Sequence, residues 1–138
     1  MEIGILSLFI LFIIGGFLGF FVDSFYRSFR RRRFTHAGYF SYIFDTTIPF
    51  LPIYGFGLVA LYLLSTILIG QNLFIKFLVY AIILSLIELI SGLFTKLTLG
   101  VRLWDYSKHR FNLFGIIDLK HSIIWGLMGV VIDILFNL

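Results

Sequence analysis

The chain has 138 residues, of which 60% are hydrophobic and only 13% are charged, and its mean hydropathy is +1.05. Soluble domains are nearer half apolar and a quarter charged, so this composition excludes an ordinary water-facing fold and favours an integral membrane protein. The chain has no cysteine, which excludes disulfides and thiolate chemistry. The length allows one domain over residues 1–138, and we expect no nucleic-acid binding from its net charge of +4.

The first apolar run, residues 3–22, is long enough for a helix of about 30 Å that crosses a bilayer. Its flanking charges are the reverse of those of a cleaved signal peptide, because an acid precedes it and a run of four arginines follows it. We therefore expect a retained helix. Gly15, Gly16 and Gly19 give this helix a flat face that another helix can approach closely.

A polar connection leads to a second apolar span, predicted over residues 49–69. Directly before it, Asp45, Thr46 and Thr47 offer side-chain oxygens that can cap the first turn of a helix. The start of the span, residues 49–57, contains two prolines and two glycines. Backbone of this kind persists at membrane depth only where protein or water covers it, so we do not expect a simple straight helix here.

A third span is predicted over residues 73–94 and a fourth over residues 119–136, with a mixed polar and aromatic segment between them. The predicted fold class is therefore an all-α integral membrane bundle of four transmembrane helices, with an interfacial segment between helices 3 and 4.

The basic residues predict an orientation. Ten of the eleven lysines and arginines lie in the connections after the first and third spans, and only Lys76 lies elsewhere. Because positive charge is retained in the cytoplasm, we expect a multi-pass protein of the cell membrane with both termini outside. The basic cytoplasmic face would attract anionic lipid of the bilayer.

Glu88 is the most anomalous residue of the third span. A carboxylate at this depth costs about 2.5–3.5 kcal/mol on insertion scales, so we expect it to face the interior, to be paired or to be protonated. It shares a helix face with small and polar residues at three- and four-residue spacing: Ala81, Ser85, Gly92 and Thr95. This face suits helix packing, and Glu88 could serve either a function or only the joining of helices.

Two other acids lie near the ends of spans. Asp23 follows the first span, where water or an arginine would satisfy it. Asp133 lies near the outer end of the fourth span, where an interfacial position is favoured and a link to Lys76 is possible.

The segment between the third and fourth spans interleaves aromatic and charged residues, as segments of the headgroup layer do. It is either an ordinary interfacial loop or a lid over a polar pocket that contains Glu88. The candidate pocket residues that it contributes are Arg102, Trp104, Asp105, Tyr106 and Asn112.

The histidines His36, His109 and His121 lack the spacing of a metal site, although Asp118 and His121 would share a helix face. We therefore expect no bound metal. The chain has no glycine-rich phosphate loop and no serine elbow, so neither a cofactor nor a catalytic residue is assigned.

Four phrases occur in a fixed order: PFLPIYGFG at residues 49–57, WDYS at 104–107, FNLFG at 111–115 and SIIWG at 122–126. Together they resemble the bacterial family of putative ABC-transporter type IV permeases, which is similar to a group of vertebrate four-span membrane proteins. The resemblance covers residues 19–125. It implies a transporter subunit. A permease driven by ATP would need a cytoplasmic partner that hydrolyses it, because the chain has no ATP-binding motif. Four short spans are also few for a translocation path, so a homo-oligomer or a separate partner subunit would be needed.

The resemblance also implies an acid in the first span and one in the third. Asp23 stands where the family typically has Glu, and Glu88 stands at the third-span acid. Ile116 departs from the family pattern, because a basic residue is expected there, and the connection before residue 49 is longer than usual. The balancing cation would then be Arg102 or Lys120.

Three functions stay open. The favoured one is a transport-related, permease-like component, in which Glu88, with Asp23, Asp105 and Asn112, lines a cytoplasm-facing polar pocket for a cation, a proton or a polar headgroup. The second is a membrane enzyme that acts on lipid at the inner interface, with Glu88 as acid or base and Asp105 or His109 assisting. The third is a structural or regulatory bundle. An enzyme is the least favoured, because no pairing of nucleophile and base can be placed.

Overall fold

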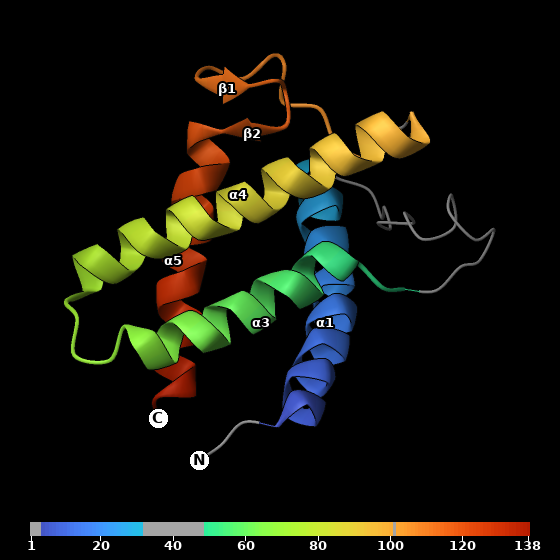
Figure 1. Cartoon of the computed structure of the whole chain (residues 1–138). Helices are drawn as coiled ribbons and strands as arrows, with labels where there is room; N and C mark the ends of the chain where they lie inside the picture. The colour runs from blue at the N-terminus through green and yellow to red at the C-terminus, as the bar shows by residue number, and fades with distance from the viewer. Residues whose placement is uncertain (1–3, 32–48, 101) are drawn as a thin grey trace. The chain divides into compact units, whose positions relative to one another are not determined.

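The computed structural model describes residues 4–31, 49–100 and 102–138. Its elements, drawn in Figure 1, are α1 (Ile5–Arg31), α3 (Pro52–Ile67), α4 (Leu73–Leu99), β1 (Asn112–Leu113), β2 (Ile117–Asp118) and α5 (Leu119–Phe136). A helix lies in each of the four predicted places. The all-helical prediction is confirmed, with the addition of one short antiparallel hairpin, β1–β2, that the sequence did not indicate.

Within the residues that the structure describes, three helices are long and apolar enough to cross a membrane: α1 over Ile5–Tyr26, α4 and α5. The remaining helix, α3, has 16 residues, and its length of about 24 Å is less than the hydrocarbon thickness of about 30 Å. A bundle of four spans therefore stays a prediction.

The predicted start of α3 was too early, because Pro49, Phe50 and Leu51 are not helical. The helix begins at Pro52, where a missing backbone N–H costs no intrahelical hydrogen bond. The cap predicted at residues 45–47 lies outside the described residues.

The chain divides within α3 into two compact units, Met1–Val59 and Ala60–Leu138. In the first unit, the glycine face of α1 packs closely against the first turns of α3. A Cβ atom at Gly15 would lie 2.9 Å from the backbone oxygen of Tyr54, and one at Gly19 would overlap the Tyr54 side chain. The predicted close approach of another helix to this face is confirmed.

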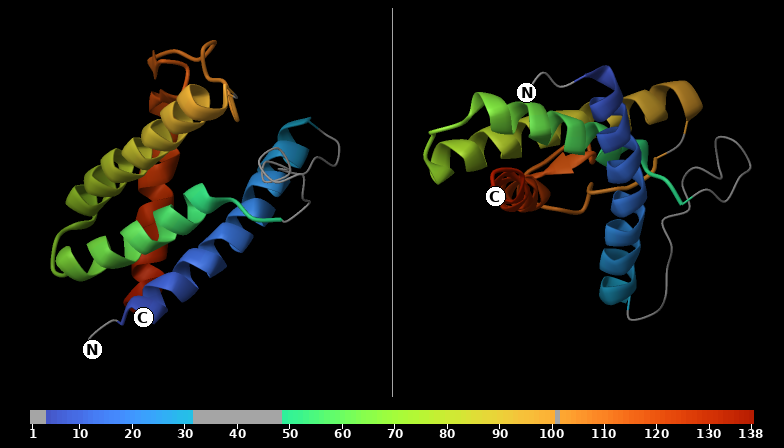
Figure 2. Two further views of the ribbon diagram at one scale, coloured as in Figure 1. Left: turned by 45° about the vertical axis from the view of Figure 1, so that its right-hand side comes forward. Right: turned by 90° about the horizontal axis from the view of Figure 1, so that it is seen from below.

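In the second unit, α4 and α5 cross and pack against each other, with α4 rising and α5 descending in Figure 1 and in the left view of Figure 2. Gly126 and Gly129 permit this approach, because added Cβ atoms would lie 2.6 Å from the Phe77 ring and 2.5 Å from the Tyr80 Cβ. The hairpin lies at the end where α4 finishes and α5 begins.

The polar face predicted for α4 is buried, since Ser85, Glu88, Gly92 and Thr95 all lie inside the unit. The opposite side of the helix exposes large apolar side chains such as Ile82 and Ile90. Exposed aliphatic side chains of this size are expected where a helix contacts lipid.

Candidate functional site

The segment between α4 and α5 folds back on the ends of both helices. α4 ends where Gly100 adopts a left-handed conformation with φ 65°, and its backbone N–H donates to the Thr95 carbonyl. Asn112 organises the turn that follows: its side-chain amide donates to the His109 carbonyl at 2.8 Å, and its oxygen accepts from the Gly115 N–H at 3.0 Å. The Tyr106 N–H donates to the Gly115 carbonyl, so the WDYS and FNLFG phrases form one structure.

Trp104 fixes this segment against α4. Its indole N–H donates to the Ile116 carbonyl at 2.7 Å. The Ile116 side chain is buried against Gly92, where a Cβ atom would overlap it. Ile116, which stands where the family pattern leads us to expect a basic residue, therefore packs the hairpin against α4.

Glu88 joins three parts of the second unit. It is 3% exposed, and its two carboxyl oxygens accept hydrogen bonds from the Tyr106 hydroxyl at 3.1 Å and the Trp125 indole N–H at 2.9 Å. The prediction that Glu88 faces the protein interior is confirmed. Its hydrogen-bond partners are two neutral donors, and Arg102 pairs with Asp105 at 3.5 Å.

The other predicted pocket residues lie in different places. Asp105 is exposed, and a hydrogen bond from the Ser107 backbone N–H holds the pKa of its carboxyl below its usual range. Asp23 belongs to α1 in the first unit. The structure therefore brings together Glu88 and Tyr106, while Asn112 shapes the turn beside them. A shared polar pocket that includes Asp23 and Asp105 stays a prediction.

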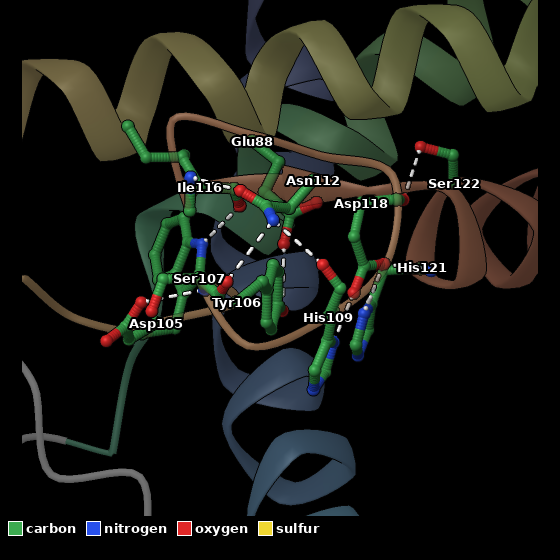
Figure 3. Close-up of polar contacts among 12 residues, drawn as sticks. Glu88, Asp105, Tyr106, Ser107, His109, Asn112, Ile116, Asp118, His121 and Ser122 are labelled. Carbon is green, nitrogen blue, oxygen red and sulfur yellow. Dashed lines mark hydrogen bonds and ion pairs between the residues drawn. The ribbon is translucent and has the colours of Figure 1, made fainter.

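A cluster that sequence reasoning missed lies at the same end. The histidine cluster consists of His109, Asp118 and His121 (Figure 3). The Asp118 carboxylate contacts the Nδ1 atoms of both imidazoles, with a distance of 2.7 Å to His121. Only the spacing of Asp118 and His121 before an apolar run could have indicated part of it, since Asp118 caps α5 by accepting from the His121 N–H.

Two features of the histidine cluster set its electrostatics. Burial opposes ionisation of Asp118, but the His121 backbone N–H and the two imidazoles together hold the pKa of Asp118 below its usual range. The Tyr106 ring stacks on His121 and His109, with centroid distances of 4.2 and 5.4 Å. The ring that donates to Glu88 thus also orients the imidazoles.

An open groove of about 610 Å³ borders this cluster. Its lining combines polar and cationic side chains with apolar ones: His109, Arg110, Phe111, Leu119, Lys120, Ile123 and Ile124. The groove is therefore mostly apolar, with the cationic residues Arg110 and Lys120 in its lining.

A second polar cluster lies at the opposite ends of α4 and α5. The lysine cluster consists of Lys76, Tyr80 and Asp133. The Lys76 ammonium pairs with Asp133 at 2.6 Å, and the Tyr80 hydroxyl donates to the other carboxylate oxygen at 2.6 Å. The interfacial position favoured for Asp133 is therefore wrong, because its carboxylate is buried and paired; the alternative, a link to Lys76, is what the structure has.

The arrangement of these phrases and helices can be set beside known proteins. The model of the family described as "Putative ABC-transporter type IV" matches residues 10–137. The chain belongs to this family. The resemblance drawn from the four sequence phrases is thereby confirmed, and the apolar helices agree with a membrane protein related to ABC transporters. No curated protein and no solved structure matches the chain.

In this family member, three of the four phrases meet at one end of the second unit. WDYS supplies Trp104 and Tyr106, FNLFG supplies the Asn112 turn, and SIIWG supplies Trp125. These phrases build the Glu88 contacts and position the histidine cluster and the groove beside them.

Proposed function

We propose that this family member is a transport-related, permease-like membrane component whose cytoplasm-facing end binds an anionic amphipathic molecule. The observation that carries the proposal is the groove beside the histidine cluster, whose lining combines cationic and apolar side chains. Anionic phospholipid is the occupant that this chemistry favours, because it presents a phosphate and an acyl chain together.

The charges of the groove suit a phosphate headgroup. Arg110 and Lys120 both line it, and each basic residue near an anionic membrane surface contributes about 1 kcal/mol of attraction. Phe111, Ile123 and Ile124 offer apolar contact to the chain below the headgroup. Neither a free inorganic anion nor a fully apolar molecule would use both parts.

Glu88 has a positioning role in this proposal. Its hydrogen bonds to Tyr106 and Trp125 hold the segment between α4 and α5 against the two helices. Opening a polar pocket around Glu88 would require these two bonds to break, so the acid would couple movement of the segment to movement of the bound headgroup. ATP hydrolysis would come from a partner subunit, and a homo-oligomer would supply the remaining walls of a translocation path.

Lipid selectivity tests the proposal. The protein in detergent micelles is titrated with brominated phosphatidylglycerol or brominated phosphatidylcholine, which quench tryptophan fluorescence, and both tryptophans lie at this end of the second unit. We expect stronger quenching by the phosphatidylglycerol, and loss of this preference in an Arg110→Gln/Lys120→Gln variant. A Lys96→Gln/Lys108→Gln variant removes the same number of positive charges outside the groove lining and should keep the preference. Equal quenching of the unmodified protein by both lipids would overturn the proposal.

A structural or regulatory bundle is the second candidate, and one observation favours it. Both oxygens of Glu88 already accept hydrogen bonds, so the acid joins helices whether or not a ligand binds. Under this alternative, each lipid would quench the tryptophan fluorescence of the Arg110→Gln/Lys120→Gln variant as strongly as that of the unmodified protein.

A further inference from the structure

The three side chains of the histidine cluster come from separate parts of the second unit. His109 lies in the turn before β1, Asp118 ends β2, and His121 lies in the first turn of α5. Each offers one ligand atom of the kind that metals prefer, and these three atoms lie within 4.8 Å of one another. Two imidazole nitrogens and one carboxylate oxygen form a donor set that suits divalent first-row transition metals.

The burial and charge of the cluster favour a cation. Asp118 is 2% exposed and His121 is 7% exposed. Within residues 4–31, 49–100 and 102–138, the ion-pair partners of Asp118 are the two imidazoles, and neither lysine nor arginine contacts it. The buried carboxylate thus has no lysine or arginine partner among the described residues, and a divalent ion would supply the positive charge.

Helix capping does not account for the whole cluster. The cap of α5 needs only an oxygen that accepts from the His121 N–H, and Asn would serve as well as Asp. Capping requires no imidazole from residue 109, whose backbone carbonyl is held by Asn112 and whose ring is directed at the same carboxylate. The convergence of His109 on Asp118 therefore needs another explanation.

Contacts around the cluster orient the ligands, as they do in metal sites. The two imidazole planes are nearly parallel, 5° apart, and both stack on the Tyr106 ring. Figure 3 shows the rings side by side below Asp118, with Tyr106 beside them. Stacking on one tyrosine ring limits the motion of both imidazoles, although at least one ring must still turn for both nitrogens to face the same ion.

We infer that His109, Asp118 and His121 form a binding site for a divalent transition-metal ion such as Zn²⁺. The nitrogens and oxygens that now share hydrogen bonds would turn to the ion and move slightly apart. Three protein ligands leave a fourth position of a tetrahedral ion for water or another oxygen ligand. Because His109 also lines the groove, this position is reached from the groove side.

Metal titration of the whole, tag-free protein tests this inference. Protein in detergent is stripped with a chelator, equilibrated with Zn²⁺ and assayed for bound metal, and Co²⁺ is then added to read its visible absorption. We expect one Zn²⁺ per chain and a Co²⁺ band that Zn²⁺ displaces. His109→Asn and Asp118→Asn should each weaken Zn²⁺ binding by at least about tenfold.

The variants separate loss of a ligand from loss of the fold. Asp118→Asn keeps a capping oxygen, so its helical content by circular dichroism should stay unchanged. Asp105→Asn removes an exposed carboxylate from the same segment and should retain the full metal content. Equal Zn²⁺ content in the unmodified protein and Asp118→Asn, or no Zn²⁺ in either, would overturn the inference. The readout uses no lipid, so it is independent of the proposed function.

Discussion

The lysine cluster and the histidine cluster lie at opposite ends of the same helix pair and differ in charge balance. In the lysine cluster one ammonium faces one carboxylate, and a tyrosine hydroxyl donates to the second oxygen. At the other end, the two buried acids Glu88 and Asp118 contact a tyrosine, a tryptophan and two histidines, with neither lysine nor arginine among these partners.

This difference in charge balance suggests a structural role for the lysine cluster and a ligand-binding role for the acids at the other end. A matched buried ion pair is already compensated, and removing one partner leaves an isolated charge. Acids whose partners include no lysine or arginine keep the capacity to bind a cation. The comparison therefore supports a helix-joining role for the lysine cluster and agrees with the ligand binding that we propose for the other end.

The largest expected effect comes from breaking the lysine cluster. Lys76→Met leaves Asp133 buried without its ammonium partner and should lower the free energy of unfolding by about 3–5 kcal/mol. Thermal unfolding in detergent, followed by circular dichroism, measures this change. Lys96→Met, at an exposed position of the same helix, should change little. Adding Asp133→Asn to Lys76→Met should recover most of the loss, and a double variant as unstable as the single one would contradict this account.

A smaller effect is expected at Glu88. Glu88→Gln keeps one oxygen that can accept from the Trp125 indole but puts an amide N–H₂ opposite the Tyr106 hydroxyl, which must then accept instead of donate, and we expect this exchange to cost about 1–3 kcal/mol. The same unfolding measurement reports it, and the Trp125 emission should shift as its hydrogen bond changes. The exposed Asp105→Asn serves as the control. Unchanged stability and emission in Glu88→Gln would show that the acid does not hold the segment.

The smallest perturbation decides which side of the membrane each cluster faces. The chain has no cysteine, so single cysteines at Gln71 and Lys108, exposed positions on either side of α4, can be labelled with an impermeant maleimide. We expect Gln71→Cys to react in intact cells and Lys108→Cys only after permeabilisation, with no loss of stability. The reverse pattern would invert the orientation and place the groove outside.

The helices and the Glu88 face could be predicted because they depend on local patterns. Long apolar runs predict α1, α4 and α5, and three- and four-residue spacing predicts the buried face of α4. The link between Lys76 and Asp133 could be considered from the sequence because Lys76 lies in the first turns of α4 and Asp133 in the last turns of α5. The first residues of the helices were harder to predict, as the non-helical residues before Pro52 show.

The histidine cluster could not be predicted from the sequence, because it depends on the register of the hairpin. Pairing of Asn112 with Asp118 brings His109 back to the start of α5. That register uses positive φ angles at Phe111 and Phe114, of 54° and 56°, which bulky residues rarely adopt. A pattern of residue types does not indicate such a backbone, so the sequence left His109 and His121 apart.

The same unusual backbone has a consequence for how the protein meets its surroundings. Phe111 and Phe114 both hold their rings on the outside of the hairpin, with 79% and 64% of their surface exposed. Exposed aromatic rings beside basic residues partition into the boundary between headgroups and acyl chains. Insertion of the two phenylalanines would thus set the depth of the hairpin in the bilayer. It would hold Arg110 and Lys120 at the level of the lipid phosphates.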